Sequence, residues 1–88
     1  MKFRLGRCVA TPAALALLNA QKIGAFDLLQ RHQSGDWGDL GRDDRHANEV
    51  ALVTGARILS AYHVGGEKLY AITEADRSST CLMLASEY

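Results

Sequence analysis

Residues 58–73 read ILSAYHVGGEKLYAIT, two apolar-rich runs on either side of the pair Gly65-Gly66. Two such runs joined by two glycines predict a β-hairpin, because glycine readily adopts the positive φ angles of a two-residue turn. Residues 75–78, ADRS, indicate a second tight connection, and residues 79–84 indicate a third consecutive strand. The C-terminal third is therefore expected to form an antiparallel meander.

Three helices are expected before the hairpin. Thr11-Pro12 supplies an N-cap residue followed by proline at the first helical position, and an Ala- and Leu-rich run follows. A later segment begins with acids, as the helix dipole favours, and ends at Gly55. In this third helix we expect Ala47, Val50, Ala51 and Thr54 to face the core. The expected helices span residues 12–20, 25–33 and 43–54.

Residues 3–9 alternate apolar and polar side chains, as a short amphipathic strand does. Placed before the helices and the meander, this strand gives the order β-α-α-α-β-β-β, which is α+β by class. The length of 88 residues, with no linker, repeat or low-complexity segment, fits a single compact domain over residues 1–88.

Ten Lys and Arg balance ten Asp and Glu, so the formal net charge is zero. Direct nucleic-acid binding is not indicated, because phosphate binding draws its affinity from clustered cations. No apolar run approaches the roughly 20 residues that a membrane span needs, and the first residues lack the apolar stretch of a secretory signal. We therefore expect a cytoplasmic protein with no membrane association.

Metal and cofactor sites are not expected either. Cys8 and Cys81 lie near opposite ends of the chain, and a disulfide is not expected in a reducing compartment. His32, His46 and His63 occur singly, without the paired spacing of metal ligands. The glycines are not followed by the Lys-Ser or Lys-Thr of a phosphate-binding loop.

Residues 34–41, SGDWGDLG, are the least regular stretch, with three glycines and two Asp around the only Trp. Trp37 has two interpretations: a plug for a small core, or an exposed aromatic anchor ringed by polar groups. The second makes this loop and the following helix a partner-binding surface. Its candidate residues are Asp36, Trp37, Asp39, Asp43 and Asp44.

An alternative hypothesis is a small metal-independent ribonuclease or toxin-like domain. It assigns general acid–base and phosphate-binding roles to His32, Glu74 and Arg77, by analogy with helices packed on an antiparallel sheet in small ribonucleases. It requires that the three side chains converge on one phosphate position.

A sheet face carrying Arg57, Tyr62, Lys68 and Tyr70 is a further candidate, for single-stranded nucleic acid. Two Tyr on facing strands are also a common cross-strand packing pair. Exposure of both rings on one face would discriminate between the two.

Several segments together resemble a family of small proteins carried by bacterial plasmids, integrative elements and phages, commonly labelled plasmid-related proteins and sometimes type I restriction enzyme subunits. The resemblance covers nearly the whole chain, although Cys81 stands where Thr is usual and Ala85-Ser86 where Pro-Glu is usual. It implies a genetic context and no established activity. The segments are Val9-Ala10-Thr11-Pro12, Arg31-His32, Gly35-Asp36-Trp37-Gly38, Asn48-Glu49, 57–62, 72–78 and Glu87-Tyr88.

Small domains of mobile elements often act by binding and blocking host machinery, and an acidic surface is one physical route. The leading expectation is a non-enzymatic interaction or inhibitory module, anti-CRISPR-like or anti-restriction, that binds a protein or nucleoprotein complex of host defence. The chain is expected to be a monomer or a homodimer, the latter joined by an edge strand or by the helix over residues 12–20.

Overall fold

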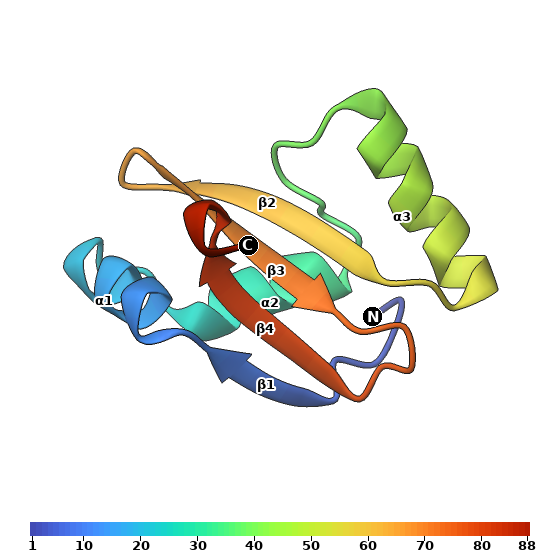
Figure 1. The fold of residues 1–88 in the computed structure, drawn as a ribbon, viewed down its shortest axis with the longest axis horizontal. Helices are drawn as coiled ribbons and strands as arrows, with labels where there is room; N and C mark the ends of the chain where they lie inside the picture. The colour runs from blue at the N-terminus through green and yellow to red at the C-terminus, as the bar shows by residue number, and fades with distance from the viewer.

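The computed structural model describes residues 1–88 and is α+β, in the predicted order (Figure 1). Thr11 caps the first helix as predicted, its side chain accepting a hydrogen bond from the backbone N–H of Ala14 at 3.1 Å. The elements are β1 (Arg7–Ala10), α1 (Pro12–Ala20), α2 (Ala25–Gln33), α3 (Arg42–Thr54), β2 (Ile58–Val64), β3 (Glu67–Thr73), β4 (Ser79–Leu84) and the 3₁₀ turn η1 (Ala85–Glu87).

The four strands form one mixed sheet in the order β1-β4-β3-β2. β2, β3 and β4 form the predicted antiparallel meander, and Gly65 and Gly66 take φ angles of 56° and 82° in the predicted turn. β1 pairs with β4 in parallel, so the first strand lies beside the last. One edge of the sheet is therefore β1 and the other is β2.

β1 is shorter than the strand predicted over residues 3–9, because Gly6 interrupts it. Gly6 has φ +66° and lies so close to the backbone of Arg77 and Ser78 that a Cβ would collide with their carbonyl oxygens. Before Gly6 the chain leaves the sheet, and Phe3 packs near His32 and Trp37. The prediction of strand over residues 3–6 is therefore wrong.

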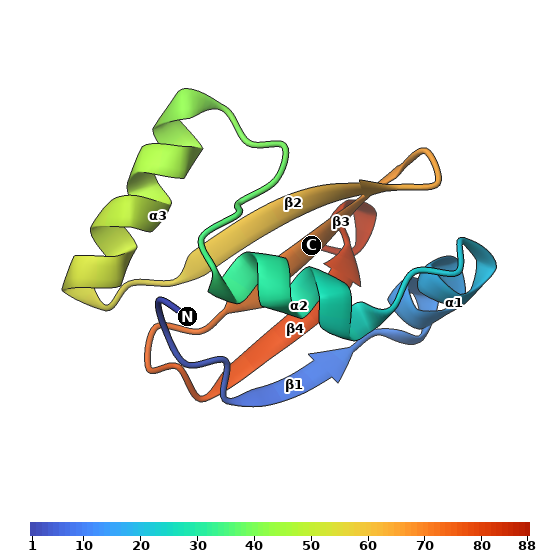
Figure 2. The ribbon, with the colours of Figure 1, turned by 180° about the vertical axis from the view of Figure 1, so that it is seen from behind.

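Helices α1 and α2 cover one face of the sheet, and α3 lies beside the β2 edge (Figures 1 and 2). The main core lies between the sheet and the first two helices. None of the helices has both the length and the apolar composition that a membrane crossing requires. The buried residues of the main core are Ala14, Leu18, Leu28, Leu29, Tyr62, Val64, Leu69, Ala71 and Leu82.

A second, smaller core lies under α3, where Trp37, Ala51 and Ile58 are buried together. Of the residues predicted to face the core from α3, Ala51 is buried, whereas Ala47, Val50 and Thr54 are exposed. The prediction is wrong for those three because α3 packs along the edge of the sheet. It therefore buries a narrow strip of its surface.

Candidate functional site

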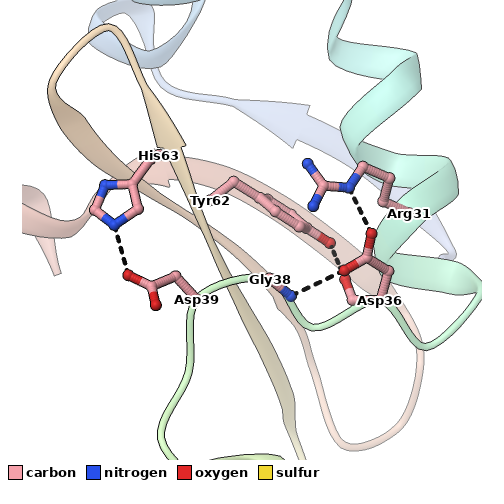
Figure 3. A pocket seen from close by; sticks show the side chains of 6 residues that line it. All are labelled: Arg31, Asp36, Gly38, Asp39, Tyr62 and His63. Carbon is pink, nitrogen blue, oxygen red and sulfur yellow. Dashed lines mark hydrogen bonds and ion pairs between the residues drawn. The ribbon is translucent and has the colours of Figure 1, made fainter.

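The polar hollow, a name we use for the open depression lined by six residues, lies between α2, the loop after it and β2 (Figure 3). Its volume is about 530 Å³, and five of its six residues are polar or glycine. Two of the predicted partner-binding residues, Asp36 and Asp39, line it. The six residues are Arg31, Asp36, Gly38, Asp39, Tyr62 and His63.

The loop that carries these acids runs along the β2 edge and is tied to it by backbone hydrogen bonds. Ala61 donates its N–H to the carbonyl of Trp37 at 3.0 Å, and Asp39 donates its N–H to the carbonyl of Ala61 at 2.7 Å. Gly38, with φ +75°, lies between them, where a Cβ would collide with the Ala61 carbonyl oxygen. A glycine at this position lets the loop approach the strand closely.

Trp37 belongs to this loop, but its side chain points inward and the residue is only 2% exposed. Its indole N–H donates to a carboxylate oxygen of Glu49 at 2.8 Å, and its ring stacks with Phe3 at 6.2 Å between centroids. The expectation of an exposed Trp37 anchor is therefore wrong. The ring is a core residue, and its contribution to any binding surface is to hold the loop in place.

Asp36 and Arg31 form an ion pair at the rim of the hollow, with 2.7 Å between Nε and Oδ2 (Figure 3). This hydrogen bond lowers the pKa of Asp36, and the Gly38 N–H contributes in the same direction. The Arg31 guanidinium stacks 4.5 Å from the centroid of the Tyr62 ring. Tyr62 donates its O–H to the carbonyl of Asp36 at 2.7 Å, and burial raises the pKa of Tyr62 to about 12.

A second acid–base pair, His63 and Asp39, lies across the hollow, with 2.5 Å between Nε2 and Oδ2. Both side chains are well exposed. The hollow therefore presents two carboxylates and two basic side chains to solvent, with the backbone beneath them fixed.

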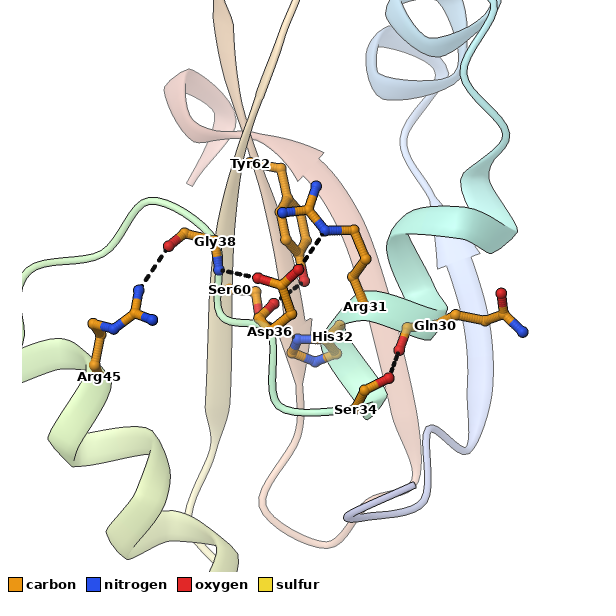
Figure 4. A network of polar contacts seen from close by, with 9 residues as sticks. All are labelled: Gln30, Arg31, His32, Ser34, Asp36, Gly38, Arg45, Ser60 and Tyr62. Atoms are coloured by element: carbon orange, nitrogen blue, oxygen red, sulfur yellow. Dashed lines mark hydrogen bonds and ion pairs between the residues drawn. The ribbon is translucent and has the colours of Figure 1, made fainter.

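The other two predicted partner-binding residues, Asp43 and Asp44, lie in the first turn of α3 and are exposed. Arg45, one residue further along, donates to the carbonyl of Gly38 at 2.8 Å and so ties α3 to the loop (Figure 4). Four acids of the predicted surface are thus exposed on one connected segment.

His32, proposed as a catalytic base, is fully buried. Its Nδ1 lies 2.5 Å from the Ser60 hydroxyl and its Nε2 lies 2.8 Å from the Thr73 hydroxyl, which in turn contacts Thr80 at 2.7 Å. Burial lowers the pKa of His32 to about 4, so the ring is neutral at pH 7. Figure 4 shows the ring among the residues beneath the loop. The histidine therefore connects α2 to β2 and β3 inside the protein.

Glu74 and Arg77 do not join His32. Glu74 pairs with Arg57 at 3.4 Å, whereas Arg77 donates to the carbonyl of Ala51 at 3.0 Å and also to that of Ala56, near the C-terminal end of α3. The structure therefore does not bring the three predicted catalytic side chains to one phosphate position.

The sheet face proposed for single-stranded nucleic acid is not formed. Tyr62 is buried with the helices, whereas Tyr70 pairs with Ala61, the neighbour of Tyr62 in the strand, and so points to the opposite face. Tyr70 instead packs edge-on against Tyr88. No basic-aromatic surface contains both tyrosines.

No group of three or more His, Cys, Asp and Glu is placed to hold a metal ion. Cys8 and Cys81 are both free thiols. Comparison of the chain with models of protein families, with curated proteins and with solved structures finds no match. The argument for function therefore starts from the residues themselves.

Arg31, Tyr62 and His63 were not predicted as part of this surface. Arg31 stands five residues before Asp36, a spacing that becomes a contact only because the chain reverses after α2. His63 meets Asp39 only because the loop is bonded to the β2 edge. Neither pairing has a local signal in the sequence.

Proposed function

We propose that this chain is a non-enzymatic interaction module of a mobile genetic element. Its acidic loop, residues 34–41, and the start of α3 bind a macromolecule of host defence. The observation that carries the proposal is the rigid presentation of Asp36 and Asp39. Both are exposed at their side chains, while the loop backbone beneath them is held by β2, Tyr62 and Arg45.

Rigid presentation favours binding because a preorganised loop loses little conformational entropy when a partner docks. Charged side chains on such a loop select partners by electrostatic complementarity and raise the association rate. The exposed acids Asp36, Asp39, Asp43 and Asp44 suit a cationic surface on the partner, as found on proteins that handle nucleic acids.

The class of partner comes from the resemblance to plasmid- and phage-carried proteins. Restriction and CRISPR effector complexes carry cationic channels for DNA or RNA, and they are cytoplasmic targets of such elements. Arg31 pairs with Asp36, and Arg42 and Arg45 interrupt the acidic segment. The proposal is therefore a local acidic contact, smaller than a full imitation of a nucleic-acid duplex.

The test is transformation of host cells that carry an active restriction or CRISPR system with a plasmid that the system cleaves. Expression of the chain is expected to raise the number of transformants. The variant Asp39→Asn, Asp43→Asn, Asp44→Asn removes three exposed charges and is expected to abolish the effect.

The matched control, Asp27→Asn, Glu67→Gln, Asp76→Asn, also removes three exposed charges, outside this surface, and should keep full activity. Circular dichroism verifies the fold of both variants. Equal loss of protection in both variants, or protection retained by the first, contradicts the proposal.

A further inference from the structure

The face of the sheet that is turned away from α1 and α2 we call the outer face. Neither of these helices lies on it, and α3 lies beside the β2 edge (Figures 1 and 2). The core residues Ala71 and Leu82 point toward the helices, so the side chains next to them in β3 and β4 point outward. The outward side chains of the three antiparallel strands form a largely apolar strip, which includes Leu59, Tyr70, Ile72, Cys81 and Met83.

A short segment of the chain, residues 85–88, folds back over this strip, and we call it the strap. Its 3₁₀ turn η1 lies in front of the strands in Figure 1, whereas α2 lies behind them. The ring of Tyr88 packs edge-on against Tyr70, with 5.7 Å between the centroids. The Tyr88 hydroxyl accepts a hydrogen bond from Arg57 at 3.0 Å. The strap therefore lies across β3 on the outer face.

The strap accounts for the burial of Ile72, which is only 3% exposed on a face without a helix. Tyr70, Ile72 and Glu74 follow one another on the outer face, because the side chains of a strand alternate. Arg57 pairs with Glu74 at 3.4 Å. Tyr88 contacts Tyr70 and bonds to Arg57, so its ring spans the position of Ile72 between them.

The contacts that hold the strap are few and exposed. The Glu87 carboxylate accepts from the Thr11 hydroxyl at 2.8 Å and from the Leu84 N–H at 2.9 Å. These bonds and the bond between Arg57 and Tyr88 lie at the surface, where water competes for the same groups. No residue of η1 is buried, and Tyr88 is 65% exposed. Such a segment detaches at a lower free energy than the unfolding of the whole domain.

We propose that the strap, residues 85–88, opens and closes over the outer face while the rest of the domain stays folded, and that its opening exposes the apolar strip around Ile72. The device controls access to a face that would otherwise be permanently open. Its named contacts lie outside the acidic loop and α3, so this proposal is independent of the proposed function.

The thiol of Cys81 is a built-in reporter of the opening. Cys81 is the register partner of Ile72 and lies beside it on the outer face. Burial raises the pKa of the Cys81 thiol, and the negative charges of Glu87 and Glu74 raise it further. Because the thiolate is the reactive form, the closed strap both shields the thiol and keeps it protonated.

The test is thiol labelling in a Cys8→Ser background, where Cys81 is the only thiol. Reaction with iodoacetamide at about pH 8 is followed by mass spectrometry. Tyr88→Ala removes the covering ring and should accelerate labelling about five- to tenfold. Tyr88→Phe keeps the ring and loses the hydrogen bond to Arg57, so its rate should be intermediate. The matched control, Val53→Ala, changes a residue of α3 that is 88% exposed and should label like the parent.

Two further measurements separate the strap from general instability. The urea midpoints of the Tyr88 variants should stay close to that of the parent, because the residue is largely exposed. In the wild-type chain, nuclear Overhauser contacts are expected between the Tyr88 ring and the Ile72 methyl groups. The variant Asp39→Asn, Asp43→Asn, Asp44→Asn should label at the parental rate, whatever its effect on protection of the plasmid.

Three results overturn the inference. The first is an equal labelling rate in the parent, Tyr88→Ala and Val53→Ala. The second is an acceleration that follows a fall in the urea midpoint, which would assign labelling to unfolding of the whole domain. The third is the absence of contacts between the Tyr88 ring and Ile72.

Discussion

The two edges of the sheet differ in whether their outward backbone groups have hydrogen-bond partners. At β2, the Asn48 side chain donates to the carbonyl of Leu59 at 2.7 Å and accepts from its N–H at 3.1 Å, as a neighbouring strand would. Two residues further along, Ala61 bonds in both directions to the loop around Trp37 and Asp39. At β1, no such partner exists.

This difference separates two uses of a strand edge. An exposed edge is open to pairing with another chain, and proteins commonly block it with side chains, loops or charges. Here a buried amide and a loop over Trp37 block β2, whereas β1 stays available beside an apolar groove. We expect substitutions at the β2 edge to lower stability and substitutions of exposed residues at β1 to leave it nearly unchanged.

The largest expected effect comes from removing the core residue under the β2 edge. Trp37→Ala deletes a ring that is 2% exposed, and should lower the free energy of unfolding by about 3–5 kcal/mol. Urea unfolding followed by circular dichroism measures the change. A loss below about 1 kcal/mol would show that the ring is not packed as described.

The next effect is a pH dependence that arises at His32, which contacts Ser60 of β2. The pKa of His32 is about 4 in the folded chain and about 6.5 when unfolded, so protonation favours the unfolded state. The contribution of His32 to stability should be complete above pH 6.5, fall by about 3 kcal/mol between pH 6.5 and 4, and level off below that.

Urea unfolding at several pH values, with His32→Gln as the comparison, isolates this effect. The variant should be less stable at pH 7 and should show a smaller loss between pH 6.5 and 4. An unchanged pH profile in the variant would assign the dependence to other groups.

Removing the side chain that pairs with the β2 edge should lower the free energy of unfolding by less than the changes above. Asn48→Ala leaves the N–H and C=O of Leu59 without their partners and should lower stability by about 2 kcal/mol. Asn48→Asp places a carboxylate oxygen against the Leu59 carbonyl oxygen at a buried position, so at pH 7 it should be at least as destabilising as Asn48→Ala. Denaturant unfolding measures the stability of both variants. Equal stability of the two variants and the wild type would contradict the role assigned to the Asn48 hydrogen bonds.

The smallest effect is expected at the open edge. Val9→Lys adds a charge to an exposed residue of β1 and should change stability by no more than about 0.5 kcal/mol. The same denaturant experiment measures it. A destabilisation as large as that of Asn48→Ala would show that the two edges do not differ in the way described.

The sequence predicted the elements whose signals are local. The Gly65-Gly66 turn fixes a hairpin between adjacent segments, and Thr11-Pro12 marks a helix start, because each signal acts within a few residues. The parallel pairing of Arg7 with Ser79 has no comparable signal, since it depends on where the intervening helices return the chain.

The candidate site was predictable only in part, for a related reason. The acids of the loop were found by composition, but Trp37 was ambiguous because an aromatic ring suits either a core or an interface. Asn48 was missed because apolar periodicity ignores a polar side chain that replaces a strand partner. His63 was missed because its contact with Asp39 depends on tertiary structure.

The pairing of β1 with β4 has a consequence during synthesis. Arg7 emerges from the ribosome 72 residues before its register partner Ser79, and at about 5–20 residues per second the interval is roughly 4–14 seconds. Until β2 and β3 have emerged, α1 and α2 have no sheet to cover, and their apolar faces are accessible to chaperones. The nascent chain is therefore expected to stay protease-sensitive until β4 has emerged.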